Sequence, residues 1–361
     1  RLNAQWTPKL DFTDETMIYA SYSRGYKGGG ANPPGVGFNT TPIIGSWPFL
    51  QILSYSQTFK PEFINAYEVG TKNTLLDGTM TLNSGVFYYD YKDYQISQIR
   101  SRTAINENFN AKVWGAELEA TWEPVPGLRF NFAGGYEKSR VGDNQLSIDP
   151  MDRLQGHTDY TIMKPWVQLP DNCVVLKSVV EQYVAQNANL NQLYRLCPGA
   201  AITNVQRNFG VTPDITPFGG NPDYPFDPVV FPNKGQGFYK NVGGNDLPNT
   251  PPFTLALGAQ YSMPISSDWA ATLRGDGYWQ GNSFARIYNS KPYDQIHAYT
   301  NLNLTLIFTN QDGWQAMAYV KNVLDTTAIT GTFLNSDDTA LTTNIFTTDP
   351  RLFGLRITKN W

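Results

Sequence analysis

The chain has no long apolar run. None of its stretches approaches the roughly 18 consecutive apolar residues that a transmembrane helix needs, and the mean hydropathy of the 361 residues is −0.38. This excludes a helical membrane protein. It does not exclude a membrane β-barrel, because only alternate residues of a barrel strand face lipid and the others can be polar.

Cysteine, histidine and excess positive charge are also scarce. The sequence has two cysteines and two histidines. Its net charge is −4, and this negative charge argues against a nucleic-acid partner. His157 and His297 lie far apart in the sequence, and neither has cysteines or carboxylates at metal-ligand spacing. Because no catalytic constellation appears either, we expect neither an enzyme nor a bound cofactor.

Alternation of apolar and polar residues is abundant, and it is clearest from 112 to 140. One face of the first limb is apolar and consists of Trp114, Ala116, Leu118, Ala120 and Trp122. A turn at 124–127 leads to a second limb, in which Leu128, Phe130 and Phe132 oppose Arg129 and Asn131. Full charges on one face and tryptophans near the ends of the other are typical of a wall with lipid outside and water inside.

The same alternation recurs along the chain. We predict about eleven strands, at 2–12, 17–24, 62–75, 79–94, 112–122, 128–140, 253–261, 269–280, 302–308, 314–322 and 352–361. Short turns alternate with long loops between them, as in bacterial outer-membrane barrels. The pattern therefore predicts an all-β, antiparallel transmembrane barrel. An odd strand count and a start at Arg1, without methionine, indicate that 1–361 is part of a larger barrel, because complete single-chain bacterial barrels have even counts.

Five segments resemble TonB-dependent outer-membrane transporters. They are 19–32 (YASYSRGYKGGGAN), 61–72 (PEFINAYEVGTK), 82–95 (LNSGVFYYDYKDYQ), 115–118 (GAEL) and 319–325 (YVKNVLD). The resemblance implies a 22-stranded barrel with an N-terminal plug and a TonB box, of which this chain would supply about the last eleven strands. It also implies TonB-driven import of a scarce, bulky nutrient, most often a ferric siderophore, that binds extracellular loops and plug apices. The plug, the TonB box and the first half of the barrel lie outside this sequence.

The alternation predicts a side for each wall residue. Those expected to face the lumen are Glu68, Lys72, Glu117, Glu119, Arg129, Arg274, Asp276, Asn303 and Arg356. Those expected to face lipid are Trp114, Leu118, Trp122, Phe130, Leu257, Leu273, Trp279 and Leu304. The lumenal charges have mixed signs, so we expect salt bridges across the wall and to a plug, with some contacts to substrate. We interpret Glu117 and Glu119 as wall charges rather than as an acid/base pair.

The last predicted strand resembles the C-terminal signal that the outer-membrane barrel-assembly machinery reads. One face carries Phe353, Leu355 and Ile357, and the chain ends on Trp361. Lys359 departs from this pattern, which usually has an apolar or aromatic residue there. Near the membrane interface the lysine can extend its ammonium group into water.

Alternative functions stay open at this point. A passive, porin-like barrel would lack a plug and a TonB box, and uptake of a glycan or vitamin would use the same fold. A secreted, soluble glycan-binding protein is a third possibility, which membrane fractionation would test. We place the protein in the bacterial outer membrane, surrounded by lipid and lipopolysaccharide.

The segment 141–247 interrupts the strand pattern and has a pattern of its own. Apolar residues at helical spacing are Leu176, Val179, Val180, Tyr183 and Val184, and after a break at 187–189 the spacing returns at Leu190, Leu193, Tyr194 and Cys197. We predict an extracellular helical hairpin. It either caps the barrel as an ordered lid or, with 25–55, forms an outer surface for the ligand.

We further predict a disulfide between Cys173 and Cys197. The two lie 24 positions apart, which is about 36 Å on one continuous helix, whereas bonded Cα atoms lie about 4.4–6.8 Å apart. The bond therefore requires the chain to double back between the two cysteines, and we expect the reversal at 187–189, where the two apolar stripes are interrupted. It would stabilise the loop by about 3 kcal/mol in the chain-entropy model, and the cell exterior is oxidising enough to keep it.

The expected result is that unfolded, unreduced protein resists thiol labelling at both cysteines and that a reductant restores labelling. Labelling at both cysteines without reductant would contradict the disulfide.

Overall fold

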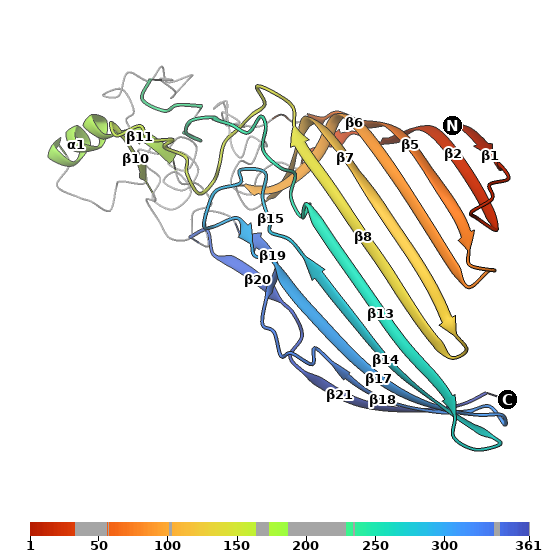
Figure 1. The fold of residues 1–361 in the computed structure, drawn as a ribbon. Coiled ribbons are helices and arrows are strands. Elements are labelled where there is room, and N and C mark those ends of the chain that lie inside the picture. The colour runs from red at the N-terminus through yellow and green to blue at the C-terminus, as the bar shows by residue number, and fades with distance from the viewer. Residues whose placement is uncertain are drawn as a thin grey trace.

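The main body of the protein is one antiparallel sheet of eleven strands (Figure 1). The computed structural model describes residues 1–32, 56, 58–100, 103–163, 173–186, 229–233, 235–335 and 340–360. Each strand of the sheet bonds to its neighbours in the order β1-β2-β5-β6-β7-β8-β13-β14-β17-β18-β21. These strands are β1 (Leu2–Trp6), β2 (Glu15–Lys27), β5 (Glu62–Leu75), β6 (Met80–Arg100), β7 (Thr103–Val125), β8 (Leu128–Val141), β13 (Phe253–Pro264), β14 (Trp269–Gln280), β17 (Tyr299–Asn310), β18 (Trp314–Lys321) and β21 (Leu352–Lys359). The predicted all-β antiparallel architecture and strand count are confirmed.

Tight turns join the strands at one end of the sheet. Gly127, between β7 and β8, has a φ of +86°, and a Cβ there would lie 2.2 Å from the Ser262 carbonyl oxygen. Gly313, between β17 and β18, has a φ of +82°, and a Cβ would lie 2.5 Å from the Asn360 carbonyl oxygen. Both turns need a residue without a side chain, since other residues rarely adopt positive φ and the space is already occupied.

The longer connections gather at the other end of the sheet and contain more structure than the sequence predicted. Small hairpins form there from β3 (Gly30–Ala31) with β4 (Thr58–Phe59), β15 (Ser283–Phe284) with β16 (Gln295–Ile296), and β19 (Ile329–Leu334) with β20 (Thr343–Thr347). The predicted end of one strand at 94 and start of the next at 112 are wrong, because β6 and β7 stay paired as far as Arg100 and Thr103. A register shift between Tyr91 and Tyr94 separates this extension from the rest of the hairpin.

The insertion between β8 and β13 is only partly described. β9 (Leu146–Ser147) pairs with β12 (Lys240–Asn241), and β10 (Tyr160–Met163) pairs with β11 (Cys173–Leu176), which leads directly into α1 (Lys177–Gln186). Val179 and Val180 pack from α1 against a small buried cluster that includes Cys173. The predicted first helix is therefore present, although Leu176 ends the strand before it. Leu190, Leu193, Tyr194 and Cys197 lie outside the described residues, so the helical hairpin and the disulfide stay predictions.

The buried apolar core lies at the loop end of the sheet. Its members are Ile96, Phe109, Ala111, Val113, Val141, Val242, Leu247, Ile287 and Tyr288. Val242, Leu247, Ile287 and Tyr288 come from connections that pack onto the upper ends of β6, β7 and β8. Within the described ranges, no helix is long and apolar enough to cross a membrane.

One face of the strands exposes its apolar side chains. Leu257 is 52% exposed, Leu273 58% and Leu355 85%, although each lies within a regular strand. Soluble monomers rarely expose many large apolar side chains side by side on one face. The exposed face is therefore the one that suits a hydrocarbon environment.

Replacing Leu273 by arginine should destabilise the folded barrel by roughly 2–4 kcal/mol, because Leu273 lies between the interfacial positions Trp269 and Trp279 and thus near the membrane midplane. The measurement is the free energy of unfolding of the whole protein from lipid vesicles. Asn303→Arg is the matched control, since Asn303 lies on the opposite face beside Asp276. Equal losses in the two variants would contradict the face assignment.

Candidate functional site: the polar wall and the loop network

The polar face of the sheet brings all the predicted lumenal residues together. The register places on this one face Glu68, Lys72, Glu117, Glu119, Arg129, Arg274, Asp276, Asn303 and Arg356. Successive strands contribute to it because directly opposed residues share a face. The polar face of the wall therefore extends from β5 to β21.

Arg274 is the best-fixed charge of the wall. Its Nε and Nη2 atoms donate to the two carboxylate oxygens of Asp276 at 2.8 and 2.5 Å, and Nη1 donates to Gln260 Oε1 at 2.9 Å. Arg274 and Asp276 line a hollow of about 430 Å³ together with Glu119, Asn131 and Tyr278, among others. The ion-paired guanidinium group of Arg274 and the carboxylate of Glu119, which is unpaired among the described residues, therefore lie on the same polar surface.

The expected salt bridges across the wall take a different form. The ion pair of Arg274 and Asp276 runs along one strand, and Arg129 pairs at 3.6 Å with Glu123 near the β7–β8 turn. Glu68 instead accepts a hydrogen bond of 2.5 Å from the Tyr19 hydroxyl. In the part of the chain that is described, no side-chain hydrogen bond or ion pair involves the following wall charges: Lys72, Glu117, Glu119 and Arg356. These charges remain available to a partner outside the sheet.

The apolar face carries the residues predicted to meet lipid. Trp114, Leu118, Trp122, Phe130, Leu257, Leu273, Trp279 and Leu304 all lie on it. At the loop end, Tyr22, Tyr67, Tyr88 and Trp114 form a continuous row across four strands, with ring centroids of Tyr22 and Tyr67 5.1 Å apart. At the turn end, Trp122 and Phe130 form a second aromatic pair at 6.0 Å. Trp114 and Trp122 are about 26 Å apart along β7, or about 20 Å across a membrane at the usual strand tilt.

The departure at Lys359 has a structural reason. Phe353, Leu355 and Ile357 share the apolar face of β21, and Lys359 follows on the same face. Its ammonium group lies 5.3 Å from the centroid of the Trp314 ring and donates to the Asp312 carbonyl oxygen. The charge is thus satisfied at the turn end by a cation–π contact and a backbone acceptor. Trp361 lies outside the described residues.

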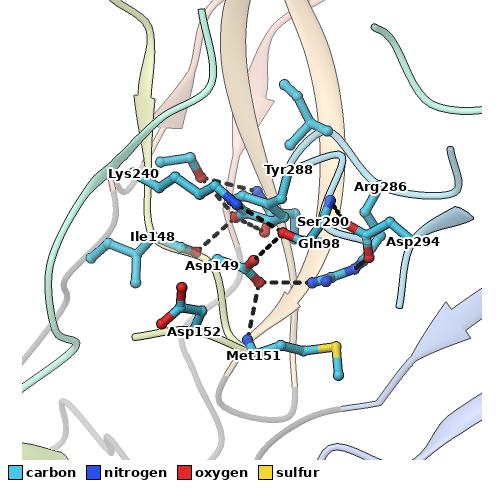
Figure 2. A network of polar contacts seen from close by, with 12 residues as sticks. Gln98, Ile148, Asp149, Met151, Asp152, Lys240, Arg286, Tyr288, Ser290 and Asp294 are labelled. Carbon is cyan, nitrogen blue, oxygen red and sulfur yellow. Dashed lines mark hydrogen bonds and ion pairs between the residues drawn. The ribbon is translucent and has the colours of Figure 1, made fainter. Parts of the chain in front are cut away.

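A buried ionic node joins two of the loops (Figure 2). Arg286 Nε donates to Asp294 Oδ1 at 2.6 Å, and Arg286 Nη1 donates to Asp149 Oδ1 at 2.9 Å. Both carboxylate side chains are fully buried. Burial raises the pKa of Asp294, and Arg286 opposes this shift. Burial lowers the pKa of Arg286, but the two carboxylates raise it by more.

Tyr288 extends the same network to the wall (Figure 2). Its hydroxyl oxygen lies 2.7 Å from Gln98 Oε1 on β6, 2.7 Å from the Ile148 carbonyl oxygen and 2.9 Å from Ser147 Oγ. Ser147 Oγ in turn donates to Glu107 on β7 at 2.6 Å. Nearby, Lys240 Nζ donates to Ser290 Oγ at 2.8 Å. The loops at 146–153 and 283–296 are therefore held to each other and to the β6–β7 extension.

Sequence reasoning did not identify this network. Asp149 and Arg286 lie 137 positions apart in segments without periodicity, so no local pattern joins them. His157, which was given no metal role, stacks on Phe238 with ring centroids 3.7 Å apart. Among the described residues, no group of three or more histidines, cysteines and carboxylates could hold a metal ion.

Comparison with known proteins identifies one family. The family model described as "TonB dependent receptor-like, beta-barrel" matches residues 1–323. No curated protein sequence matches the chain. Among solved structures, the chain is similar to the ferric yersiniabactin uptake receptor FyuA from Yersinia pestis, with a TM-score of 0.54, 16% identity and coverage of 98% of this chain and 35% of that one.

A second solved structure gives the same result. The siderophore receptor PiuA from Acinetobacter baumannii has a TM-score of 0.51 at 14% identity, again with coverage of 98% of this chain and 35% of that chain. The chain thus spans about a third of the length of these receptors. At such identities, the likeness shows the fold alone.

Replacing Arg286 by methionine should loosen the loops at 146–153 and 283–296. The change leaves two buried carboxylates without their cation, which typically costs about 3–5 kcal/mol. The measurement is amide hydrogen exchange of these segments in the folded protein. Adding Asp294→Asn to the variant should restore part of the protection, because it removes one uncompensated charge. Arg351→Met is the control, since Arg351 is exposed and lies 3.9 Å from Asp325, so its loss should cost at most about 1 kcal/mol. Equal exchange in the two single variants would contradict a structural role of the node.

Proposed function

The chain belongs to the TonB-dependent receptor β-barrel family, and from this premise we propose that it forms part of the outer-membrane wall through which a scarce, bulky nutrient is imported with energy from TonB. The ligand class we propose is a ferric siderophore. The family is one of outer-membrane transport barrels rather than of enzymes, and the proposal assigns the protein no catalytic residue.

The division of the sheet into two faces carries this proposal. The apolar face, bounded by aromatic rows, suits the bilayer, and the polar face suits a water-filled interior. The polar face retains the unpartnered charges of Lys72, Glu117, Glu119 and Arg356. We propose that these charges contact a plug domain inside the barrel and that the hollow beside Arg274 lies along the route of the ligand.

The proposed ligand rests on the similar structures and on the loops. FyuA is a ferric yersiniabactin uptake receptor and PiuA a siderophore receptor. Here the loops at 146–153 and 283–296 are tied together by the Arg286 node, so they can present a preorganised surface above the lumen. We propose that the ligand binds first at this loop end, and that TonB then acts through the plug.

The remaining proposed partners follow from the same arrangement. The apolar face of β21, with Phe353, Leu355 and Ile357, would be read by the barrel-assembly machinery. β1 and β21 each have one neighbour in the described sheet, so we propose that further strands of the whole protein pair with them to close the barrel.

Uptake of iron-loaded siderophores tests the function. In a strain whose only receptor of this kind is the whole protein, radiolabelled ferric siderophores should enter the cell under iron limitation, and deletion of TonB should abolish uptake while binding to cells persists. Leakage of small solutes into vesicles that contain the protein should be absent, because the plug would occlude the lumen.

Other results would select a different function. TonB-independent entry of small solutes would replace the proposal with a passive pore. TonB-dependent entry of a glycan or a vitamin, without ferric siderophores, would retain active import and overturn the ligand class.

A further inference from the structure

The buried ionic node of the loops contains more negative than positive charge. The side chains of Asp149 and Asp294 are fully buried, and within the described residues Arg286 is the one cation that bonds to either carboxylate (Figure 2). Each contact uses a single guanidinium nitrogen, and the third nitrogen, Nη2, is buried with no hydrogen-bond partner in the part of the chain that is described. Two buried carboxylates therefore share one cation, which leaves one negative charge in excess.

A second cation offsets this excess only in part. Lys240 on β12 donates to Ser290 Oγ at 2.8 Å, and that oxygen lies 3.4 Å from Asp149 Oδ2. A hydroxyl group thus separates the ammonium group from the carboxylate. Lys240 is also half-exposed, so water shares its charge.

Other titratable groups around the node do not neutralise it. Those that are exposed to water are Asp152, Lys291, Tyr293 and His297. Those that are bonded to other groups are Glu107, Arg153, Asp246 and Tyr288. Within the described residues, none of them forms an ion pair with Asp149 or Asp294. Closing the loops therefore buries a charge that the protein itself does not fully compensate.

This burial changes how firmly the node holds a proton. Burial raises the pKa of Asp294, Arg286 and the Ser290 N–H group lower it by less, and Asp149 raises it further. When the loops open, both carboxylates reach water, where an aspartate has its ordinary pKa of about 3.9. The closed node therefore binds a proton more tightly than the open loops do. By linkage, closing becomes more favourable as the pH falls through the raised value, and the gain is complete near the ordinary one.

We infer that the node is a proton-linked latch: one proton, taken up from water by the pair of Asp149 and Asp294, holds the loops at 146–153 and 283–296 together more firmly in a mildly acidic medium than in a neutral one. The geometry offers the proton a place. Asp149 Oδ1 accepts from Arg286 Nη1 and from the Met151 N–H group, whereas Oδ2 has only the distant Ser290 hydroxyl. A carboxyl O–H at Oδ2 would donate to that hydroxyl. The two carboxyl groups share one guanidinium, so they titrate as a unit.

A balanced ion pair would respond in the opposite direction. Pairing with a full cation lowers the pKa of a carboxyl group, and such a contact is lost as acid protonates it. The sign of the pH effect therefore distinguishes a node with excess negative charge from an ordinary salt bridge. The inference concerns the stability of the loops and does not rest on the proposed import, so either can fail without the other.

Amide hydrogen exchange of the whole protein in lipid vesicles tests the latch. Exchange of the segments 146–153 and 283–296 is measured between about pH 8 and about pH 4, and each rate is divided by the rate of an unprotected amide at the same pH. The protection of both segments should rise as the pH falls, by at most about tenfold for each pH unit, which is the limit for one proton. Protection that stays constant or falls in acid would overturn the inference.

Substitutions at the node make the result specific. Asp294→Asn and Asp149→Asn each leave one carboxylate for Arg286, so either should abolish the rise in protection. Asp143→Asn is the matched control, because Asp143 is an exposed carboxylate of the same end, paired with Arg140, and its loss should leave the rise unchanged. A rise that persists in both node variants would also overturn the inference.

Lys240→Gln separates the latch from a purely structural role. Removing this cation makes the surroundings of the two carboxylates more negative, so the rise in protection should move to higher pH. A role in packing alone would lower protection equally at every pH, and that result would contradict the latch. Because Lys240 is half-exposed, this variant and the wild-type profile decide the question even if the aspartate variants do not fold.

Discussion

Pairing of backbone N–H and C=O groups in a medium without water is the constraint on which this structure depends. Each unpaired group in hydrocarbon costs several kcal/mol, so the strands bond to their sequence neighbours along almost their whole length. The same constraint applies to the outer edges of β1 and β21. The proposed pairing of these edges with further strands would meet this constraint, and it agrees with membership of the TonB-dependent receptor β-barrel family.

Because the backbone N–H and C=O groups are hydrogen-bonded within the sheet, only the side chains can make its two faces different. Because side chains alternate along a strand, Glu117 and Glu119 lie on one face and Leu118 lies on the other. The residues of β6 and β8 that are directly opposite them lie on the same faces as their partners. Arg274 has a partner in Asp276, whereas Glu117 and Glu119 have none among the described residues. This imbalance is tolerable only on a face that meets water or a complementary charged surface.

The sequence predicted the wall well because the period of 2 is local information. The strands from β5 to β21, the faces of their residues and the turns at Gly127 and Gly313 could all be read from neighbouring positions. The β6–β7 extension was missed because its side chains share a buried cluster with distant segments, as Phe109 does with Val242 and Ile287. The Arg286 node was missed for the same reason, since its partners are set by tertiary structure and not by spacing.

The loop end meets water, so it needs stabilisation of a different kind from the wall. Backbone pairing is no longer enforced there, and the loops are instead held by a buried apolar cluster and an ionic node. Both are attached to strands, because Tyr288 bonds to Gln98 on β6 and the Leu247 backbone bonds to Ser139 on β8. A register slip of one residue in β6 or β8 would turn these anchors to the opposite face. The register that separates the polar face from the apolar face thus also fixes the positions of these loops.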